Sequence, residues 1–521
     1  MHARVTGRPA VLERDLQAGG LRRLLGRASL VGAGTLCQQG LSFASGLVVA
    51  RVLGAADYGM FNLARNLSDI AGVVTRLGLD IGLQRHLGED ASPAARAAQA
   101  ALLARVRLLA GGFAMLPALL VLLGAGAALE SGVYRYERFA ETLLCLLLVL
   151  PFATDLAVLG GAYRGVLRLG PPVLAEYFLL PALRLAAIVA LFLAGWRLWA
   201  VVAGSMLATA VASLLLAARA RRDFPPVAAA AAAGGWRDAW RVVRYSSVLS
   251  AAVLVTTLAA GVDLLLLGHF AGAEETGQYA LARTLLLLVG VSGVAFGQGL
   301  GAQVARHHAE GDPQAVAAVV ALTVRWIALV TAPVYALFLF WGATAVSLFG
   351  PSFALPQSVV AWLASAQFLV SVLGPAGWIL SMTGRHCAEL AILSAGLLVS
   401  LVGGWLAIPA FGQLGAAVST CIGIAVATAG RVLIARHVLA RLPFGGDVVV
   451  ATGIAVLLAA LAAALTAGLG WPGPARAAAG AGLFLLLYGA AAWRFLLQPG
   501  ERLQLRGIWG ALTARLAGAA P

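Results

Sequence analysis

The sequence predicts an all-α polytopic membrane protein of about 14 transmembrane helices, in two pseudo-symmetric six-helix lobes plus two C-terminal helices. Three observations lead to this prediction: the composition, a series of long apolar runs and an internal repeat. Of the 521 residues, 61% are hydrophobic and 11% are charged, whereas about 25% of residues are charged in soluble domains. This composition excludes a soluble protein.

Each apolar run is long enough to cross a bilayer. A membrane-spanning helix needs about 20 mostly apolar residues, and its backbone groups must bond within their own segment. Fourteen such runs are centred near residues 39, 71, 114, 150, 184, 207, 256, 290, 328, 368, 398, 423, 457 and 486. The runs near 71, 184 and 368 also contain charged residues or prolines.

The distribution of arginine indicates the orientation. All 37 basic residues are arginine, and most lie in the two tails and in the loops that follow even-numbered spans. The opposite loops carry acids instead, namely Glu130, Glu137, Glu141, Glu274 and Glu275. Because basic residues stay on the cytoplasmic side, both termini are predicted to be cytoplasmic. The formal net charge of +15 then reflects topology and anionic headgroups, and we expect no nucleic-acid partner.

An internal repeat divides the chain. Residues 51–65 read RVLGAADYGMFNLAR and residues 269–283 read HFAGAEETGQYALAR, with glycine, alanine, leucine and arginine at matching positions 218 residues apart. Each copy is predicted to run from the outer end of one span, through a short turn, into the next span. In transporters built from parallel repeats, the substrate site lies between the two lobes. A purely structural duplication is the alternative.

The repeat and the loop composition predict six segments. They are a cytoplasmic N-terminal tail (1–27), an N-lobe of spans 1–6 (28–222), a cytoplasmic linker (223–242), a C-lobe of spans 7–12 (243–440), spans 13 and 14 (441–497) and a cytoplasmic amphipathic tail (498–521). The tail mixes leucine, isoleucine and tryptophan with arginine at helical spacing, which is typical of a helix on the inner leaflet.

Span 2 carries a stripe of charged residues. Arg65, Asp69, Arg76 and Asp80 are separated by 4, 7 and 4 residues, so in one continuous helix they fall within an arc of about 60°. A charged stripe cannot face lipid, where each central charge costs about 2.5 to 3.5 kcal/mol. It is predicted to face water or other charges. The alternative is a structural stripe that is self-neutralising through pairing at i, i+4.

Other charged residues lie inside predicted spans. The candidate substrate-binding residues are Arg65, Arg76, Arg184, Arg283 and Arg325, and the candidate charge partners or ion-coupling residues are Asp69, Asp80, Asp155, Glu176 and Asp263. Arginine bonds phosphate oxygens bidentately, so this excess favours an anionic cargo. No metal site or cofactor is expected, and the absence of lysine excludes a Walker-type nucleotide loop.

The stretch around span 2 resembles a known family. Residues 50–87, ARVLGAADYGMFNLARNLSDIAGVVTRLGLDIGLQRHL, resemble the second-span region of the polysaccharide biosynthesis, or Wzx-like oligosaccharide flippase, family. Its superfamily also holds lipid II flippases and multidrug and toxin extruders. The residues that match the family pattern A-R-x-L-G-x-x-x-Y/F-G are Ala50, Arg51, Leu53, Gly54, Tyr58 and Gly59, and those that approximate its second part are Leu77, Gly78, Leu79 and Arg85.

The resemblance implies a transporter of the bacterial cytoplasmic membrane. It would be a flippase that moves a polyprenyl-pyrophosphate-linked oligosaccharide to the outer leaflet, alongside a polysaccharide polymerase and glycosyltransferases of the same pathway. Lipid II flippases bind pyrophosphate through cavity arginines of spans 1, 2 and 8. Arg65 and Arg283 fall in spans 2 and 8, whereas span 1 offers only Arg27 at its inner edge. The alternatives are a cation-coupled multidrug exporter, a membrane glycan polymerase or ligase, and a non-transporting scaffold.

Overall fold

The computed structural model describes the whole chain except residues 1–19, 90–94, 225–234, 440–443, 469 and 503–521. The described residues form helices and connecting turns, with no strand among them, which confirms the predicted all-α class. Most of the predicted N-terminal tail, the centre of the predicted linker and the amphipathic stretch of the C-terminal tail lie outside the described residues.

The chain forms two compact units, Met1–Gly261 and Val262–Pro521. The first unit contains α2 (Gly20–Arg76), α3 (Leu79–Glu89), α4 (Ala95–Leu120), η1 (Val121–Ala125), α5 (Gly126–Ala128), η2 (Leu129–Val133), α6 (Phe139–Leu148), α7 (Leu150–Gly165), α8 (Gly170–Pro172), η3 (Val173–Leu179), α9 (Leu180–Leu193) and α10 (Leu198–Asp223). The boundary between the units falls inside α11 (Trp236–Phe270).

The second unit continues from α11. It contains α12 (Ala273–Ala309), α13 (Pro313–Ser347), α14 (Gln357–Leu373), α15 (Pro375–Met382), α16 (His386–Phe411), α17 (Gln413–Leu439), α18 (Gly446–Ala467), α19 (Gly473–Ala491) and η5 (Ala492–Leu496). Because α11 already begins at Trp236, the last part of the predicted linker is helical. The predicted lobe boundaries stay a prediction.

The helices make this a multi-pass membrane protein. The described residues hold 12 helices that are long and apolar enough to cross a bilayer, and α14 with α15, bent by 43°, raises this to 13. All fourteen predicted centres fall inside these helices. One helical stretch, Gly34–Gly88, contains the first two centres and has 55 residues. At 1.5 Å per residue it is about 80 Å long, more than twice the thickness of the hydrocarbon core. The total of fourteen crossings stays a prediction.

The break that divides this long stretch lies in the repeat. Gly54 adopts φ 75° and ψ 176° inside α2, a conformation that is essentially restricted to glycine. The matching residue of the second copy, Gly272, is the N-cap of α12, directly after the end of α11. Both copies therefore interrupt the helix at the same glycine, and both place an arginine eleven residues later.

A second break corrects the predicted charged stripe. Leu77 and Gly78 have positive φ values of 51° and 65°, so α2 ends at Arg76 and α3 begins at Leu79. A single helix from Arg65 to Asp80 was the wrong expectation. The close approach of α11 explains the glycine, since a Cβ on Gly78 would lie 2.7 Å from the Ser246 carbonyl oxygen.

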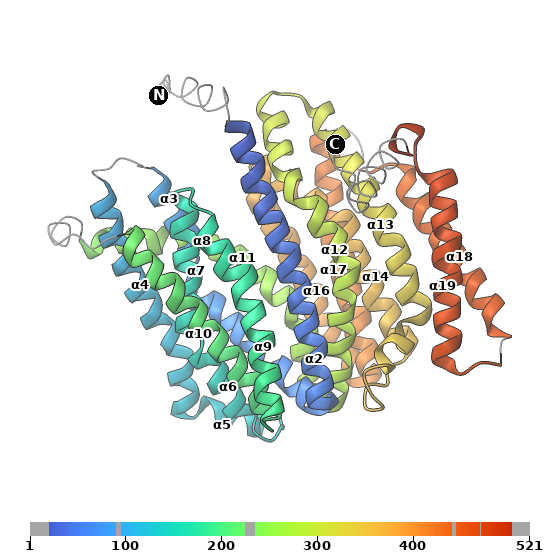
Figure 1. Cartoon of the computed structure of the whole chain (residues 1–521), viewed down its shortest axis with the longest axis horizontal. Helices are drawn as coiled ribbons and strands as arrows, with labels where there is room; N and C mark the ends of the chain where they lie inside the picture. The colour runs from blue at the N-terminus through green and yellow to red at the C-terminus, as the bar shows by residue number, and fades with distance from the viewer. Residues whose placement is uncertain (1–19, 90–94, 225–234, 440–443, 469, 503–521) are drawn as a thin grey trace, which may run out of the picture. The chain divides into compact units, whose positions relative to one another are not determined.

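The cores consist of small and branched apolar side chains. In the first unit, the inward face of α3 packs against α7 and against Ala239, Val242 and Val243 of α11. In the second unit, α18 and α19 lie side by side (Figure 1). They pack against α13 through alanines, Phe484 and Tyr488. Small residues at these contacts let membrane helices approach closely.

We expect Gly54→Ala to destabilise the protein, because alanine is strained at φ 75° by about 1 to 3 kcal/mol. Gly40→Ala is the matched control: it lies in the same helix without a positive φ, and neither glycine has a neighbour within 4 Å of an added Cβ. Thermal unfolding in detergent should show a lower Tm for Gly54→Ala and an equal or higher Tm for Gly40→Ala. Equal Tm values for Gly54→Ala and the wild type would contradict the strain argument.

Cysteines at the start of α12 and at the start of α13 test the predicted orientation. In a cysteine-free background, Glu274→Cys is expected to react with an impermeant thiol reagent in intact cells, because it begins a span that enters from outside. Gln314→Cys, at the start of α13, should react only after the cells are opened. The reverse pattern would overturn the placement of both termini in the cytoplasm.

Candidate functional site

The first charged cluster joins α2 and α9. Arg65 Nε lies 3.9 Å from Asp69 Oδ2, with side chains that are 48% and 65% exposed, so the predicted i, i+4 pairing is present as a long, exposed contact. Arg184 of α9 interacts electrostatically with both residues. Its Nε is buried and has no hydrogen-bond partner among the described residues. Two guanidinium groups therefore share one carboxylate, which leaves an excess of positive charge.

The second cluster surrounds Glu176 in the π-helical segment η3. Arg164 Nη1 lies 3.4 Å from Glu176 Oε2, and Arg76 and Asp80 are close enough to Glu176 to interact electrostatically. The neighbouring Gly160 makes room for this carboxylate, because a Cβ there would lie 2.0 Å from Glu176 Oε1. Single π-turns occur frequently at functional sites. This cluster has two acids for its two arginines and no excess charge.

Two atoms of the second cluster lack a partner. Arg76 Nε and Glu176 Oε1 are buried without a hydrogen bond to the described residues. Among the described residues, Arg76 and Asp80 also form no ion pair with each other. The predicted pairing of these two residues is therefore wrong, because the break at Leu77 and Gly78 separates them. Sequence reasoning missed Arg164, which ends α7 next to the predicted site.

Asp155 forms an ion pair in which both carboxylate oxygens accept hydrogen bonds. Arg107 of α4 donates from Nε to Asp155 Oδ1 at 2.5 Å and from Nη2 to Oδ2 at 3.0 Å. The Ser213 hydroxyl donates to Oδ2 at 3.1 Å. These contacts join α4, α7 and α10. Arg107 was not among the predicted residues, although an arginine inside an apolar run was the available signal.

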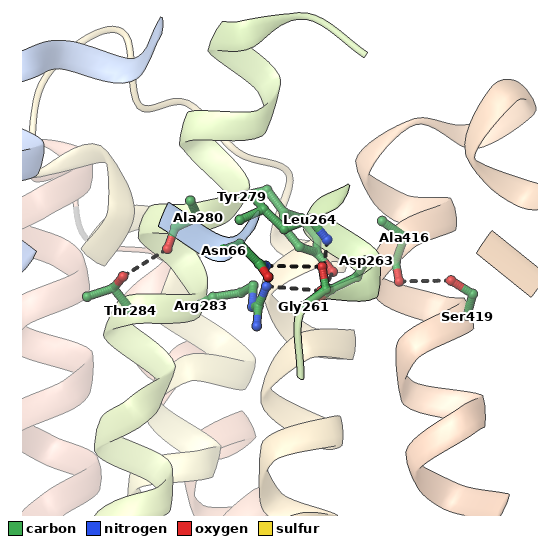
Figure 2. A network of polar contacts seen from close by, with 10 residues as sticks. All are labelled: Asn66, Gly261, Asp263, Leu264, Tyr279, Ala280, Arg283, Thr284, Ala416 and Ser419. Carbon is green, nitrogen blue, oxygen red and sulfur yellow. Dashed lines mark hydrogen bonds and ion pairs between the residues drawn. The ribbon is translucent and has the colours of Figure 1, made fainter. Parts of the chain in front are cut away.

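Asp263 and Arg283 pair inside the second unit. Arg283 Nη1 donates to Asp263 Oδ1 at 3.0 Å, and the Tyr279 hydroxyl donates to Oδ2 at 2.9 Å. Figure 2 shows Tyr279 and Arg283 reaching Asp263 from α12. Asp263 is 3% exposed and Tyr279 is fully buried. The predicted arginine therefore has a buried acid as its direct neighbour. Tyr279 was missed as a site residue, although its alignment with Phe61 in the repeat was visible.

Arg325 is enclosed by acids. Its Nη1 and Nη2 donate to Glu501 at 2.5 and 3.0 Å, and Nη2 also donates to the Leu496 carbonyl at 2.8 Å. Asp447 lies 3.2 Å from Arg325 Nε. These contacts fasten α13 to the start of α18 and to the segment after η5. The arrangement indicates a structural role for Arg325 in the C-terminal hairpin.

A further ion pair in the second unit was not predicted. Glu389 of α16 accepts a hydrogen bond from Arg431 Nε of α17 at 2.9 Å.

Among the described residues, no group of three or more His, Cys, Asp or Glu side chains could hold a metal ion.

Comparison with known proteins identifies the family. Residues 25–300 match the family model described as polysaccharide biosynthesis protein, which is more than half of the chain. The chain belongs to this family. The match includes the repeat copy around Arg65 and ends after the copy around Arg283, so both arginines lie inside the region that defines the polysaccharide biosynthesis protein family. No curated protein matches.

Solved structures show which fold this family member has. The lipid II flippase MurJ, in an inward closed conformation, is similar with a TM-score of 0.69 and 11% identity, over 90% of this chain and 100% of that chain. An inward-facing multidrug resistance MATE family transporter of the MOP superfamily is similar with a TM-score of 0.56 and 16% identity, over 77% and 94%. An outward-facing multidrug resistance MATE family transporter is similar with a TM-score of 0.51 and 15% identity, over 80% of this chain and 95% of that chain. At these identities the likeness concerns the fold alone.

The pH dependence of stability should reveal the Arg325 network. Burial raises the pKa of the Glu501 carboxyl, but hydrogen bonds from Arg325 and from the Gln498 backbone N–H outweigh it, so the pKa lies below its ordinary value of 4.5. The stabilisation is therefore complete above pH 4.5 and is lost as the pH falls through the lowered value. We expect Glu501→Gln to lose about 2 kcal/mol at pH 7.

Thermal unfolding of wild type and Glu501→Gln from pH 7 to pH 3 measures this difference, which should shrink toward the acid end. Glu137→Gln, an exposed glutamate, is the control and should show no comparable loss at pH 7. A Glu501→Gln deficit that is constant with pH would contradict the role of the ionised carboxylate.

Proposed function

We propose that this protein is a flippase that translocates a polyprenyl-pyrophosphate-linked oligosaccharide from the inner to the outer leaflet, by alternating access, for cell-surface polysaccharide assembly. Membership of the polysaccharide biosynthesis protein family supports the pathway. The fold shared with the lipid II flippase MurJ supports the type of transport. The observation that carries the proposal furthest is the excess positive charge of Arg65 and Arg184 over Asp69.

This excess fits a phosphate-bearing cargo. A charge near the bilayer centre costs about 2.5 to 3.5 kcal/mol, and two nearby guanidinium groups also repel each other. A pyrophosphate would offset both terms, because it carries negative charge and several acceptor oxygens. Arg184 Nε, which has no partner among the described residues, supplies a donor that such a ligand would satisfy. Bidentate bonding to phosphate oxygens is the particular strength of arginine.

The remaining arginines receive different roles in this proposal. Arg283 is the equivalent of Arg65 in the second repeat and is therefore a further candidate phosphate-binding arginine. Arg76 belongs to the cluster around Glu176, where Asp80 and Glu176 balance the charge and are candidates for ion coupling. Arg325 stabilises the C-terminal hairpin, because three acceptor groups already surround it.

Helix breaks provide the places where conformation can change. Gly54 and the pair Leu77–Gly78 interrupt the first unit, and α14 and α15 are bent by 43° in the second. Hinges typically lie at a few such element ends. Two compact units with internal breaks suit alternating access. An ion gradient, the membrane potential or downstream consumption of the product would drive the cycle without an enzymatic step. The protein would act in the bacterial cytoplasmic membrane with both termini cytoplasmic, beside a polymerase and glycosyltransferases.

A cation-coupled multidrug exporter is the second candidate. The similarity to an inward-facing MATE transporter, with a TM-score of 0.56, favours it at the level of the fold. An exporter of cationic drugs needs acids that outnumber arginines at its binding site, whereas the cluster at Arg65 has the opposite balance. Drug susceptibility of a deletion strain distinguishes the two candidates, because only the exporter would change it.

Arg65→Ala and Arg184→Ala should each lower binding of the lipid-linked substrate about tenfold or more, since a charge-assisted hydrogen bond contributes about 1.5 to 3 kcal/mol. Lysine at Arg65 should restore binding only in part, because it keeps the charge but loses the bidentate geometry. The measurements are surface glycan at equal protein levels and binding of the purified lipid-linked substrate. Arg306→Ala is the control, because Arg306 pairs with the exposed Glu310 outside the spans. Normal binding and export by both alanine variants would reject the site.

A further inference from the structure

The two repeat copies differ at the positions that hold the arginine. With the offset of 218 residues, Asp263 corresponds to Ser45 and Tyr279 corresponds to Phe61, while Arg283 corresponds to Arg65. The turn glycines Gly54 and Gly272 also correspond in sequence, although their φ values are 75° and −76°. The arginine is therefore retained in both halves, and its buried hydrogen-bonding neighbours are present in only one.

In the second copy the arginine is held by a fixed carboxylate. Both oxygens of Asp263 accept hydrogen bonds, Oδ1 from Arg283 at 3.0 Å and from the Leu264 N–H at 2.8 Å, and Oδ2 from Tyr279 at 2.9 Å. Because Asp263 is 3% exposed, water screens this ion pair little. A phosphate that approaches Arg283 must compete with Asp263 for the same guanidinium.

In the first copy no comparable partner exists among the described residues. Ser45 is buried and its hydroxyl has no hydrogen-bond partner there, and Phe61 cannot donate a hydrogen bond. The acid beside Arg65 is Asp69, which is on the same helix, 3.9 Å away and 65% exposed. An exposed i, i+4 pair of this kind is weak, so Arg65 keeps most of its capacity for an incoming anion.

We propose that Asp263, oriented by Tyr279, restrains Arg283, so that Arg65 is the stronger phosphate-binding arginine and Arg283 the weaker one. The two arginines are then unequal in phosphate binding although their positions in the repeat are equivalent. The inference rests on the proposed function, and it adds that Asp263 and Tyr279 are positioning residues that lower the affinity for the cargo's phosphates. The restraint on Arg283 favours release of a phosphate bound there, because the ion pair with Asp263 re-forms as the phosphate leaves.

Binding of inorganic pyrophosphate to the purified full chain, measured by calorimetry in detergent, tests this ranking. Asp263→Asn should bind at least about threefold more tightly, because the competing charge is gone while the side-chain shape is kept. Arg65→Ala should lose more affinity than Arg283→Ala, and Asp263→Asn should give no gain in an Arg283→Ala background. General structural damage would not raise the affinity. Unchanged or weaker binding by Asp263→Asn would overturn the proposal.

The matched control is Glu389→Gln. Glu389 also pairs with an arginine, Arg431, inside the second unit, so its substitution changes the net charge of that unit by the same amount. It should alter pyrophosphate affinity by less than about twofold. A gain equal to that of Asp263→Asn would assign the effect to overall charge, and the restraint on Arg283 would be rejected.

The restraint can also be transplanted. Ser45→Asp together with Phe61→Tyr places the acid and the hydroxyl at the positions that correspond to Asp263 and Tyr279, so pyrophosphate binding should fall about tenfold, close to that of Arg65→Ala. If the double variant unfolds, the modification experiment with the Asp263→Asn variant decides instead. A correctly folded double variant with wild-type affinity would contradict the inference.

Chemical modification supplies a readout that needs no ligand. Phenylglyoxal modifies arginine, and mass spectrometry gives the rate at Arg283, with the exposed Arg385 as internal standard. Asp263→Asn should raise the rate at Arg283 and leave that at Arg65 unchanged. A raised rate with no pyrophosphate binding by any variant would support the restraint and reject the proposed function. If the wild type binds pyrophosphate but Asp263→Asn leaves the modification rate at Arg283 unchanged, the restraint is rejected and the proposed function is retained.

Discussion

The cost of placing a charge in a hydrocarbon environment governs this structure. Most of the chain satisfies its polar groups by forming helices, and the few charged side chains in the spans must find partners within their own unit. Asp155, Asp263 and Arg325 do so through several hydrogen bonds each. Arg65 and Arg184 do so only in part, since one exposed carboxylate serves both. The cluster at Arg65 is proposed as the functional one because of this incomplete compensation, not because of the presence of charge.

The cluster around Glu176 coincides with irregular backbone, and the cluster at Arg65 follows a helix break. Glu176 lies in a π-helical segment, Arg76 is the last residue of α2, and Arg65 follows the break at Gly54 by eleven residues. An uninterrupted helix satisfies its own backbone but fixes every side chain at 100° intervals. Breaks loosen this restriction and bring side chains from different elements together. The proposed transport cycle uses the same breaks as points of bending, so in that proposal charge placement and conformational change depend on the same residues.

The sequence predicted the helical class, the position of every apolar run and the family, because hydrophobicity over about 20 residues is a strong signal. It also predicted the Arg65–Asp69 contact, which depends only on helical spacing. It failed at Asp80, because positive φ at Leu77 depends on the packing of α11 against Gly78, a contact with a residue far along the chain. The sequence also did not predict ion pairs between helices, such as that of Arg107 with Asp155, because such pairing depends on tertiary structure.

The network around Arg325 has a practical consequence for handling the protein. Glu501 lies beyond the last apolar helix, yet it completes the coordination of a guanidinium inside α13. A truncation that removes the residues after Leu496 would therefore remove both hydrogen bonds that Arg325 donates to Glu501, in the helix that supports α18 and α19. An affinity tag or fluorescent reporter should therefore be joined after Glu501. A protein that ends before Glu501 would be an unsuitable reference for comparing variants elsewhere in the chain.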